Sequence, residues 1–145
     1  MYLSREYELE SLHSNKQFTP SSRYNLTNLF RSMFALELEN RLKKTSISVA
    51  VAHPGVTKSR QSRPYEVKKF KKSFYTYFST NIQTGIAPII QAIEEDNVSA
   101  ERVYAPKIFG FYGQPATMQH NKLVYNEELR NKLWTFTANE LNLDL

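Results

Sequence analysis

Apolar side chains in the first third of the chain recur at the three- and four-residue spacing of one helix face. The row consists of Leu26, Leu29, Phe30, Met33 and Phe34, and Leu38 and Leu42 prolong it. That periodicity is typical of an amphipathic helix. Thr19 can cap the first free N–H groups, and Pro20 suits the first helical position. The pattern predicts a helix over residues 20–44, whose apolar row is either core or a subunit interface.

A strand pattern follows this helix. Ile47, Val49 and Val51 alternate with small residues over positions 46–52, which indicates a strand covered on both faces. The breakers His53-Pro54-Gly55 end it, and His53 is expected to be structural there. A helix that feeds a buried strand through a short connection favours an α/β fold with a parallel sheet.

The remaining pattern predicts two more helices and one short strand. Isoleucines between Ile82 and Ile93 show helical spacing, and Pro88 should bend that helix or leave one carbonyl free. Val103-Tyr104 is a short strand candidate that ends at Pro106. A loop follows at Gly110, Gly113 and Pro115, and the last helix starts near Asn126, with Leu129, Leu133, Trp134 and Leu141 on its apolar side. With no repeat or linker, residues 1–145 are predicted to form a single domain.

Composition places the chain among ordinary globular proteins. It has 145 residues, of which 41% are hydrophobic and 23% charged. It has no cysteine, and its three histidines lie far apart, so no metal site is predicted. No apolar run approaches the roughly 20 residues needed to cross a bilayer, and the first ten residues do not resemble a signal peptide. We therefore expect a cytoplasmic protein with no membrane contact.

The formal net charge of +5 has a local origin. Lysines and arginines crowd the segment Lys58 to Lys72, and aromatic residues follow it through Phe78. Basic groups can contact phosphates and aromatic rings can stack on bases, so this segment could bind nucleic acid. The favoured interpretation is a substrate-loop helix with a solvated basic face, within a basic region over residues 56–79.

Several motifs, in order, resemble the short-chain dehydrogenases/reductases. Tyr24, in a helix that begins Thr19-Pro20, resembles the active-site tyrosine of that family, and His53-Pro54-Gly55 resembles the end of its following strand. Further similar segments are Phe34 with Glu37 and Leu38, Thr84-Gly85, Tyr104-Ala105-Pro106, and Glu128-Leu129 with Leu133-Trp134. Tyr7 to Leu12 is similar to a loop of the retinol-dehydrogenase-like branch. The resemblance implies a partial Rossmann-like fold, namely the C-terminal half of a doubly wound parallel sheet with long flanking helices.

The resemblance also implies which residues would form a site for NAD or NADP. In the family a tyrosine exchanges a proton with the substrate oxygen, and a lysine four residues later lowers its pKa from about 10. Here Tyr24 stands at the tyrosine position and the neutral Asn28 at the lysine position. Phe30 and Arg31 are expected to crowd and recharge the face where nicotinamide would lie. The residual half-site consists of Pro54, Gly55, Val56 and Ser59, which match a segment that contacts nicotinamide and phosphate in the family.

The chain lacks the fingerprint that holds a dinucleotide. That fingerprint is a Gly-rich turn between a strand and a helix, whose N-terminus binds the pyrophosphate. The chain has four glycines, and none makes such a turn. We therefore expect a truncated family member that neither binds NAD or NADP tightly nor reacts by itself. Two alternatives remain open: an oligomerising or protein-interaction module, with a homo-oligomer through the helix at 20–44, and a nucleic-acid binder through residues 58–72.

Overall fold

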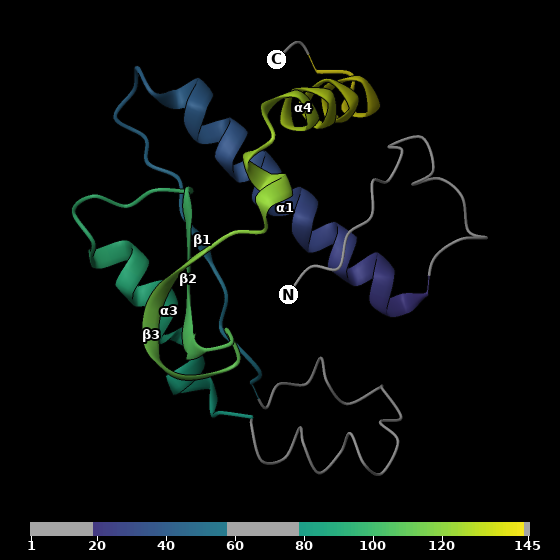
Figure 1. Ribbon diagram of the computed structural model, residues 1–145. Coiled ribbons are helices and arrows are strands. Elements are labelled where there is room, and N and C mark those ends of the chain that lie inside the picture. The colour runs from purple at the N-terminus through teal and green to yellow at the C-terminus, as the bar shows by residue number, and fades with distance from the viewer. Residues whose placement is uncertain (1–18, 58–78, 144–145) are drawn as a thin grey trace. The chain divides into compact units, whose positions relative to one another are not determined.

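The computed structural model describes residues 19–57 and 79–143, which form two compact units. We call residues 1–49 with 120–145 the helical unit, and residues 50–119 the sheet unit. Figure 1 shows the elements of each unit along the chain. The predictions that concern the basic segment 58–72 and Ser59 lie outside the described residues.

The helical unit consists of α1 (Pro20–Leu42), the 3₁₀-helix η3 (Lys122–Tyr125) and α4 (Glu127–Leu141). The Thr19 side chain accepts a hydrogen bond from the Ser22 N–H at 3.2 Å, which confirms the predicted start of α1. Asn126 caps α4 in the same way, accepting from the Leu129 N–H at 3.0 Å. The helix α1 ends two residues earlier than predicted, because Lys43 is already its C-cap residue.

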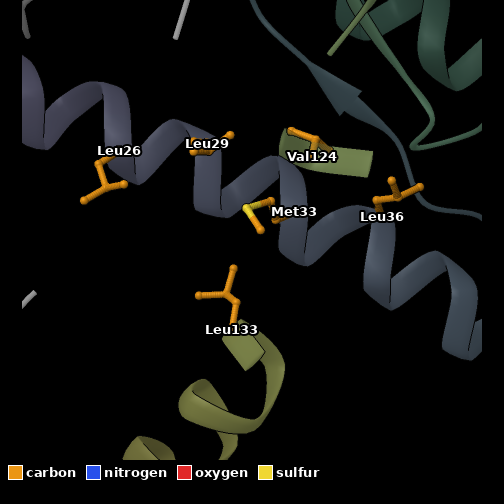
Figure 2. Packing of buried hydrophobic residues seen from close by; sticks show 6 residues of the cluster. All are labelled: Leu26, Leu29, Met33, Leu36, Val124 and Leu133. Carbon is orange, nitrogen blue, oxygen red and sulfur yellow. The ribbon is translucent and has the colours of Figure 1, made fainter. Parts of the chain in front are cut away.

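The core of the helical unit is built on the predicted apolar row of α1. Figure 2 shows Leu26, Leu29 and Met33 of this row, and Leu36 beyond it, with Val124 of η3 and Leu133 of α4. The buried cluster consists of Leu26, Leu29, Met33, Leu36, Val124 and Leu133. Leu26, Leu29 and Met33 of the row are therefore core within this unit.

A buried ion pair joins α1 to α4. The Arg130 Nε atom lies 3.5 Å from Glu37 Oε2, and both side chains are about nine-tenths buried. Arg41 also pairs with Glu37, at 3.0 Å, and the Arg130 guanidinium donates to the Val124 carbonyl at 3.0 Å. These partners compensate the desolvation that each buried charge would otherwise suffer.

An aromatic stack lies beside this pair. The rings of Phe34 and Trp134 are stacked with their centroids 4.9 Å apart, and the Arg41 guanidinium lies 4.4 Å from the Trp134 ring centroid. Phe34 and Glu37, which resembled a family motif, therefore hold the two long helices together in this structure. Trp134 anchors the last helix in the core, as its position in the apolar pattern predicts.

The sheet unit contains a three-stranded mixed sheet and the helix α3 (Ile82–Glu94), as Figure 1 shows. The strands are β1 (Val51–Ala52), β2 (Arg102–Ile108) and β3 (Tyr112–Gln119), in the order β1-β2-β3. The pair β1–β2 is parallel and the pair β2–β3 is antiparallel. The described fold is thus α/β, with the expected parallel pair and an additional antiparallel strand.

The hairpin β2–β3 replaces the predicted loop at Gly110, Gly113 and Pro115. Three residues, Phe109 to Phe111, connect the two strands. Phe109 and Gly110 have φ of 52° and 73°, and the Phe111 N–H donates to the Ile108 carbonyl at 2.9 Å. Two positive φ values are typical of a type I′ hairpin turn, which Asn-Gly usually signals. Phe-Gly hid that signal, and Pro115 is tolerated because β3 is at the edge of the described sheet.

The strand β1 is shorter than the alternation over positions 46–52 predicts. Only Val51 and Ala52 are paired, with Val103 and Tyr104 of β2. Ile47 is 61% exposed rather than covered. An alternating pattern indicates a strand that could be covered, but a ladder also needs neighbouring strands, and β2 is the one strand paired with β1 in the described sheet.

The helix α3 packs with its small residues and exposes its large ones. Gly85, Pro88 and Ala92 are buried, whereas Ile82, Ile86, Ile89, Ile90 and Ile93 are 39–78% exposed. A Cβ atom at Gly85 would overlap the Thr57 side chain, so glycine permits this close approach. The helix continues through Pro88. Among the described helices, none is both long and apolar enough to span a membrane.

Candidate functional site

Tyr24 lies in the first two turns of α1 and is 61% exposed. The hydroxyl-bearing residues around the cap fix this end of the helix, because Ser22 also donates to the Thr19 carbonyl at 2.9 Å. Asn28 is half-buried and lies one turn further along the same face. The structure therefore presents the tyrosine at the surface, with a neutral amide at the place where the family resemblance requires a cation.

Phe30 and Arg31, which also depart from the family pattern, lie on different faces of α1. Phe30 packs against the buried cluster of the helical unit. Helix periodicity of about 100° per residue separates Phe30 from the Tyr24 face. Arg31 is exposed and, seven residues after Tyr24, shares that face. Arg31 therefore adds a positive charge on the face of Tyr24, and Phe30 lies on another face of α1.

The loop after β1 carries the other half of the expected site. The His53 N–H donates to the Tyr104 carbonyl at 2.8 Å, which fixes the end of β1 against β2. The Gly55 N–H donates to His53 Nδ1 at 2.8 Å, so this nitrogen of His53 is a hydrogen-bond acceptor. His53 thus stabilises the turn of its own loop, which agrees with the structural role predicted for it.

The turn at Gly55 is enclosed by the hairpin. Gly55 has a φ of 73°, in the left-handed region that favours glycine. A Cβ atom there would lie 2.6 Å from the Phe111 carbonyl oxygen and 2.8 Å from Pro106 Cγ. The hairpin tip therefore approaches the Pro54-Gly55 segment so closely that only glycine fits at position 55.

Val56 has both of its backbone polar groups occupied within the sheet unit. Its N–H donates to the Phe111 carbonyl at 3.2 Å. Its carbonyl accepts from the Thr80 N–H at 2.8 Å and from Thr80 Oγ1 at 3.4 Å. Pro54 has no N–H, and that of Gly55 is bonded to His53. The segment Pro54 to Val56 thus has no backbone N–H left to donate to a ligand.

The predicted site residues are divided between the two units. Tyr24 and Asn28 belong to the helical unit, and Pro54, Gly55 and Val56 belong to the sheet unit. Each group is described by itself, and Ser59 lies outside the described residues.

Comparison with known proteins indicates a distant relationship to an oxidoreductase. The chain is similar to retinol dehydrogenase 14 from Mus musculus. The two sequences are 25% identical over 66% of this chain and 30% of that protein. The fold is also similar to the crystal structure of an uncharacterised protein from Mycobacterium paratuberculosis, with a TM-score of 0.65 and 18% identity over 91% of this chain. No family model matches the chain.

The chain spans 30% of the length of the retinol dehydrogenase and 43% of the solved chain. The family that the sequence resembles uses a nicotinamide cofactor. The described residues do not fit such a cofactor as they stand. The Pro54 to Val56 segment has no N–H to offer, and none of the described glycines joins a strand to a helix N-terminus in a dinucleotide turn.

The sequence pattern does not predict the hydrogen bonds that occupy the backbone of the Pro54 to Val56 segment. The bonds from Val56 to Phe111 and Thr80 join residues far apart in the sequence, and no local motif announces them. The turn at Phe109-Gly110 determines where the Phe111 carbonyl is placed, and it lacks the Asn-Gly pair that would have signalled a hairpin. The Glu37–Arg130 pair, 93 residues apart, was likewise out of reach of spacing arguments.

Proposed function

We propose that this chain is a non-catalytic relative of the short-chain dehydrogenases/reductases. It represents part of that fold, carries the helix of the proton-exchanging tyrosine, and neither binds NAD or NADP tightly nor transfers hydride by itself. The distant similarity to a retinol dehydrogenase supports the relationship. The observation that carries the loss of activity is the occupation of both polar groups of Val56.

The chemistry of Tyr24 supports the same proposal. Hydride transfer to a carbonyl needs a cofactor that carries the hydride and a group that supplies the proton. Tyr24 could offer its phenol to a substrate oxygen because it is exposed. The neutral Asn28 amide can form hydrogen bonds but cannot stabilise a phenolate by charge. Proton supply and cofactor binding are therefore both impaired, each for its own reason.

The proposal is tested by isothermal titration calorimetry of the full chain with NAD⁺, NADH, NADP⁺ and NADPH. We expect no saturable binding at micromolar concentrations of chain and cofactor. Micromolar affinity for any of the four would overturn the proposal, since it would require the Pro54 to Val56 segment to rearrange or to be unnecessary.

A charge-restoring variant separates the two impairments. Asn28→Lys returns the cation to the tyrosine face, and Asn25→Lys in the same helix is the matched control. We expect neither variant to bind a nicotinamide cofactor, because the change leaves Val56 bonded to Phe111 and Thr80. Cofactor binding restored by Asn28→Lys alone would show that the loop contacts are not the obstacle.

A further inference from the structure

The tip of the β2–β3 hairpin exposes aromatic rings that the proposed function does not use. Phe109, Phe111 and Tyr112 are 82%, 39% and 46% exposed, and they lie within four consecutive residues. Exposed apolar residues that cluster, rather than occur singly, mark surfaces that contact another molecule. The tip is therefore a candidate binding surface of the sheet unit.

Phe109 has an unfavourable backbone conformation at this tip. Its φ of 52° lies in the left-handed region, which bulky side chains rarely adopt and for which hairpin turns prefer asparagine. Because Phe109 is so exposed, packing within its own unit does not explain why an aromatic residue stands there. Backbone strain of this kind is concentrated at functional sites. A ligand for the ring therefore explains Phe109 better than the stability of the hairpin does.

The hairpin that carries these rings is basic. Lys107 is exposed beside them, and the hairpin from Arg102 to Gln119 contains no aspartate or glutamate. Arg102 pairs with Glu95 at 3.7 Å, but at the far end of β2. That end is about 20 Å from the tip, at roughly 3.3 Å per residue of strand. The tip thus offers rings and a cation, and its surroundings in the hairpin favour a negatively charged ligand.

The tip also lies beside the point at which the basic segment of the sequence begins. The Val56 N–H donates to the Phe111 carbonyl at 3.2 Å, and Thr57 forms a parallel bridge with Thr80. The next residue after Thr57 opens the segment Lys58 to Lys72, which holds seven basic residues and one acidic residue. Because this charge is tethered through Thr57, it adds to the attraction of a polyanion toward the tip.

Exposed rings beside a cation are the chemistry that recognises single-stranded nucleic acid, whose bases stack on the rings while its phosphates contact basic groups. The order of side chains also resembles the Lys-Gly-Phe-Gly-Phe motif with which RNA-recognition sheets stack bases, with matches at Lys107, Phe109, Gly110 and Phe111. Here the motif forms a turn, and Ile108 stands in place of its first glycine. The shared feature is the spacing of the cation and the two rings.

We propose that the hairpin tip is a binding site for single-stranded nucleic acid. Bases stack on Phe109, Phe111 and Tyr112, and Lys107 contacts a phosphate. This site differs from the alternative through residues 58–72, because all of its side chains lie among the described residues. It does not depend on the cofactor proposal, because none of these side chains belongs to the expected nicotinamide half-site.

Fluorescence anisotropy of the full chain with labelled oligonucleotides tests the binding. The probes are single strands of uridine or of thymidine, about twelve nucleotides long, which distinguish RNA from DNA, and a mixed-sequence duplex of the same length. We expect saturable binding to at least one single strand and roughly tenfold weaker binding to the duplex, whose bases are already stacked on one another. Equal affinity for single strand and duplex, or no binding to either single strand, would overturn the proposal.

Phe109→Asn removes the most exposed ring without endangering the fold, because asparagine suits this turn. We expect the variant to be at least as stable as the wild type and to bind the single strand roughly tenfold more weakly, since it loses one stacking partner. Ile93→Asn in α3 is the matched control, because Ile93 is 78% exposed and should leave the affinity unchanged. An unchanged affinity of Phe109→Asn, or equal losses for both variants, would contradict the proposed site.

Phe109→Trp reports the contact directly. A base that stacks on the new indole ring should quench its fluorescence, and the wild type, whose Trp134 is buried, supplies the background. We expect binding of the single strand to be retained and the added fluorescence to fall on titration. Binding without that additional quenching would place the strand away from the tip.

Co-sedimentation with vesicles of phosphatidylcholine and phosphatidylserine tests a lipid surface as the other occupant of an aromatic and basic tip. We expect no vesicle binding that depends on Phe109. Vesicle binding that Phe109→Asn abolishes, together with an unchanged affinity of this variant for the oligonucleotides, would assign the rings to a membrane and overturn the proposal.

Discussion

The helical unit and the sheet unit use their apolar residues in opposite ways. In the helical unit the large side chains of α1 point into a cluster completed by Val124 and Leu133. In the sheet unit α3 packs with glycine, proline and alanine, and its isoleucines remain exposed. Both helices are amphipathic, so periodicity alone does not tell which face is covered by the same chain. The contrast shows that α1 buries its large apolar side chains within its own unit, whereas α3 leaves its large apolar side chains exposed.

The largest effect is expected at the buried charge pair of the helical unit. Glu37→Ala leaves the Arg130 guanidinium buried without its carboxylate partner. Breaking such a pair from one side costs about 3–5 kcal/mol of unfolding free energy. Urea denaturation measures this loss. Glu128→Ala, which removes the exposed pair with Lys132, should leave the transition unchanged, and equal losses would contradict the difference between the two pairs.

A matched pair of truncations tests the contrast between the units directly. Leu29→Ala removes a side chain that is 3% exposed, and a loss of about 2–5 kcal/mol is expected from lost transfer energy and the cavity. Ile93→Ala in α3, 78% exposed, should change stability by less than about 0.5 kcal/mol at low protein concentration. A large loss for Ile93→Ala would show that the isoleucine side chains of α3 are covered within one copy.

Two glycines with the same φ of 73° separate backbone strain from close contact. Gly110→Ala meets open space, with Met118 Sδ nearest at 3.8 Å, and should lose about 1–2 kcal/mol from the left-handed conformation alone. Gly55→Ala suffers the same strain and also presses on the Phe111 carbonyl. We therefore expect a larger loss for Gly55→Ala in chemical denaturation. Equal losses would mean that the hairpin moves away from the loop at no cost.

A gain in stability is expected at the turn of the hairpin. Phe109 is 82% exposed and has a φ of 52°, a conformation that disfavours bulky side chains. Phe109→Asn creates the Asn-Gly pair preferred in type I′ turns, and should raise the unfolding free energy by about 1 kcal/mol. Phe109→Ala keeps the strain and serves as the control in thermal unfolding. A stabilisation as large for Ala as for Asn would attribute the gain to the lost aromatic ring.

A pH effect confined to alkaline solution is expected at Tyr104 in the sheet unit. Burial, followed by the nearby Glu95 carboxylate, raises the pKa of Tyr104 above its ordinary value of 10.0. The folded state therefore retains this proton when the unfolded state releases it, and stability falls as pH rises above about 10. Tyr104→Phe should flatten this fall in urea titrations between neutral and alkaline pH. An unchanged alkaline slope would exclude Tyr104 as its source.

Local sequence signals were sufficient for the long helices. Thr19-Pro20 and the leucine spacing give the start and the buried face of α1, and Asn126 marks the cap of α4. The pairing of strands was less accessible, because it depends on distant partners. Ile47 and Val49 have a strand pattern without a ladder, and the Phe-Gly turn forms a hairpin without the usual Asn.

For the expected site, too, the sequence predicts local placement better than long-range contacts. The family resemblance places Tyr24 in a long helix and Gly55 directly after a strand, and the structure has α1 and β1 at those places. What the resemblance could not supply is the partner of each backbone group. The carbonyl that meets Val56 comes from Phe111, and its position follows from the geometry of the hairpin.

The hydrogen bond from the Val56 N–H to the Phe111 carbonyl depends on the length of the β2–β3 hairpin. Phe111 lies in the connection between β2 and β3, so inserting or deleting one residue there would move its carbonyl away from Val56. The N–H of Val56 would then lose its acceptor and become free to bind something else. A change in the length of the β2–β3 hairpin would thus free the Val56 N–H without changing any residue of the Pro54 to Val56 loop.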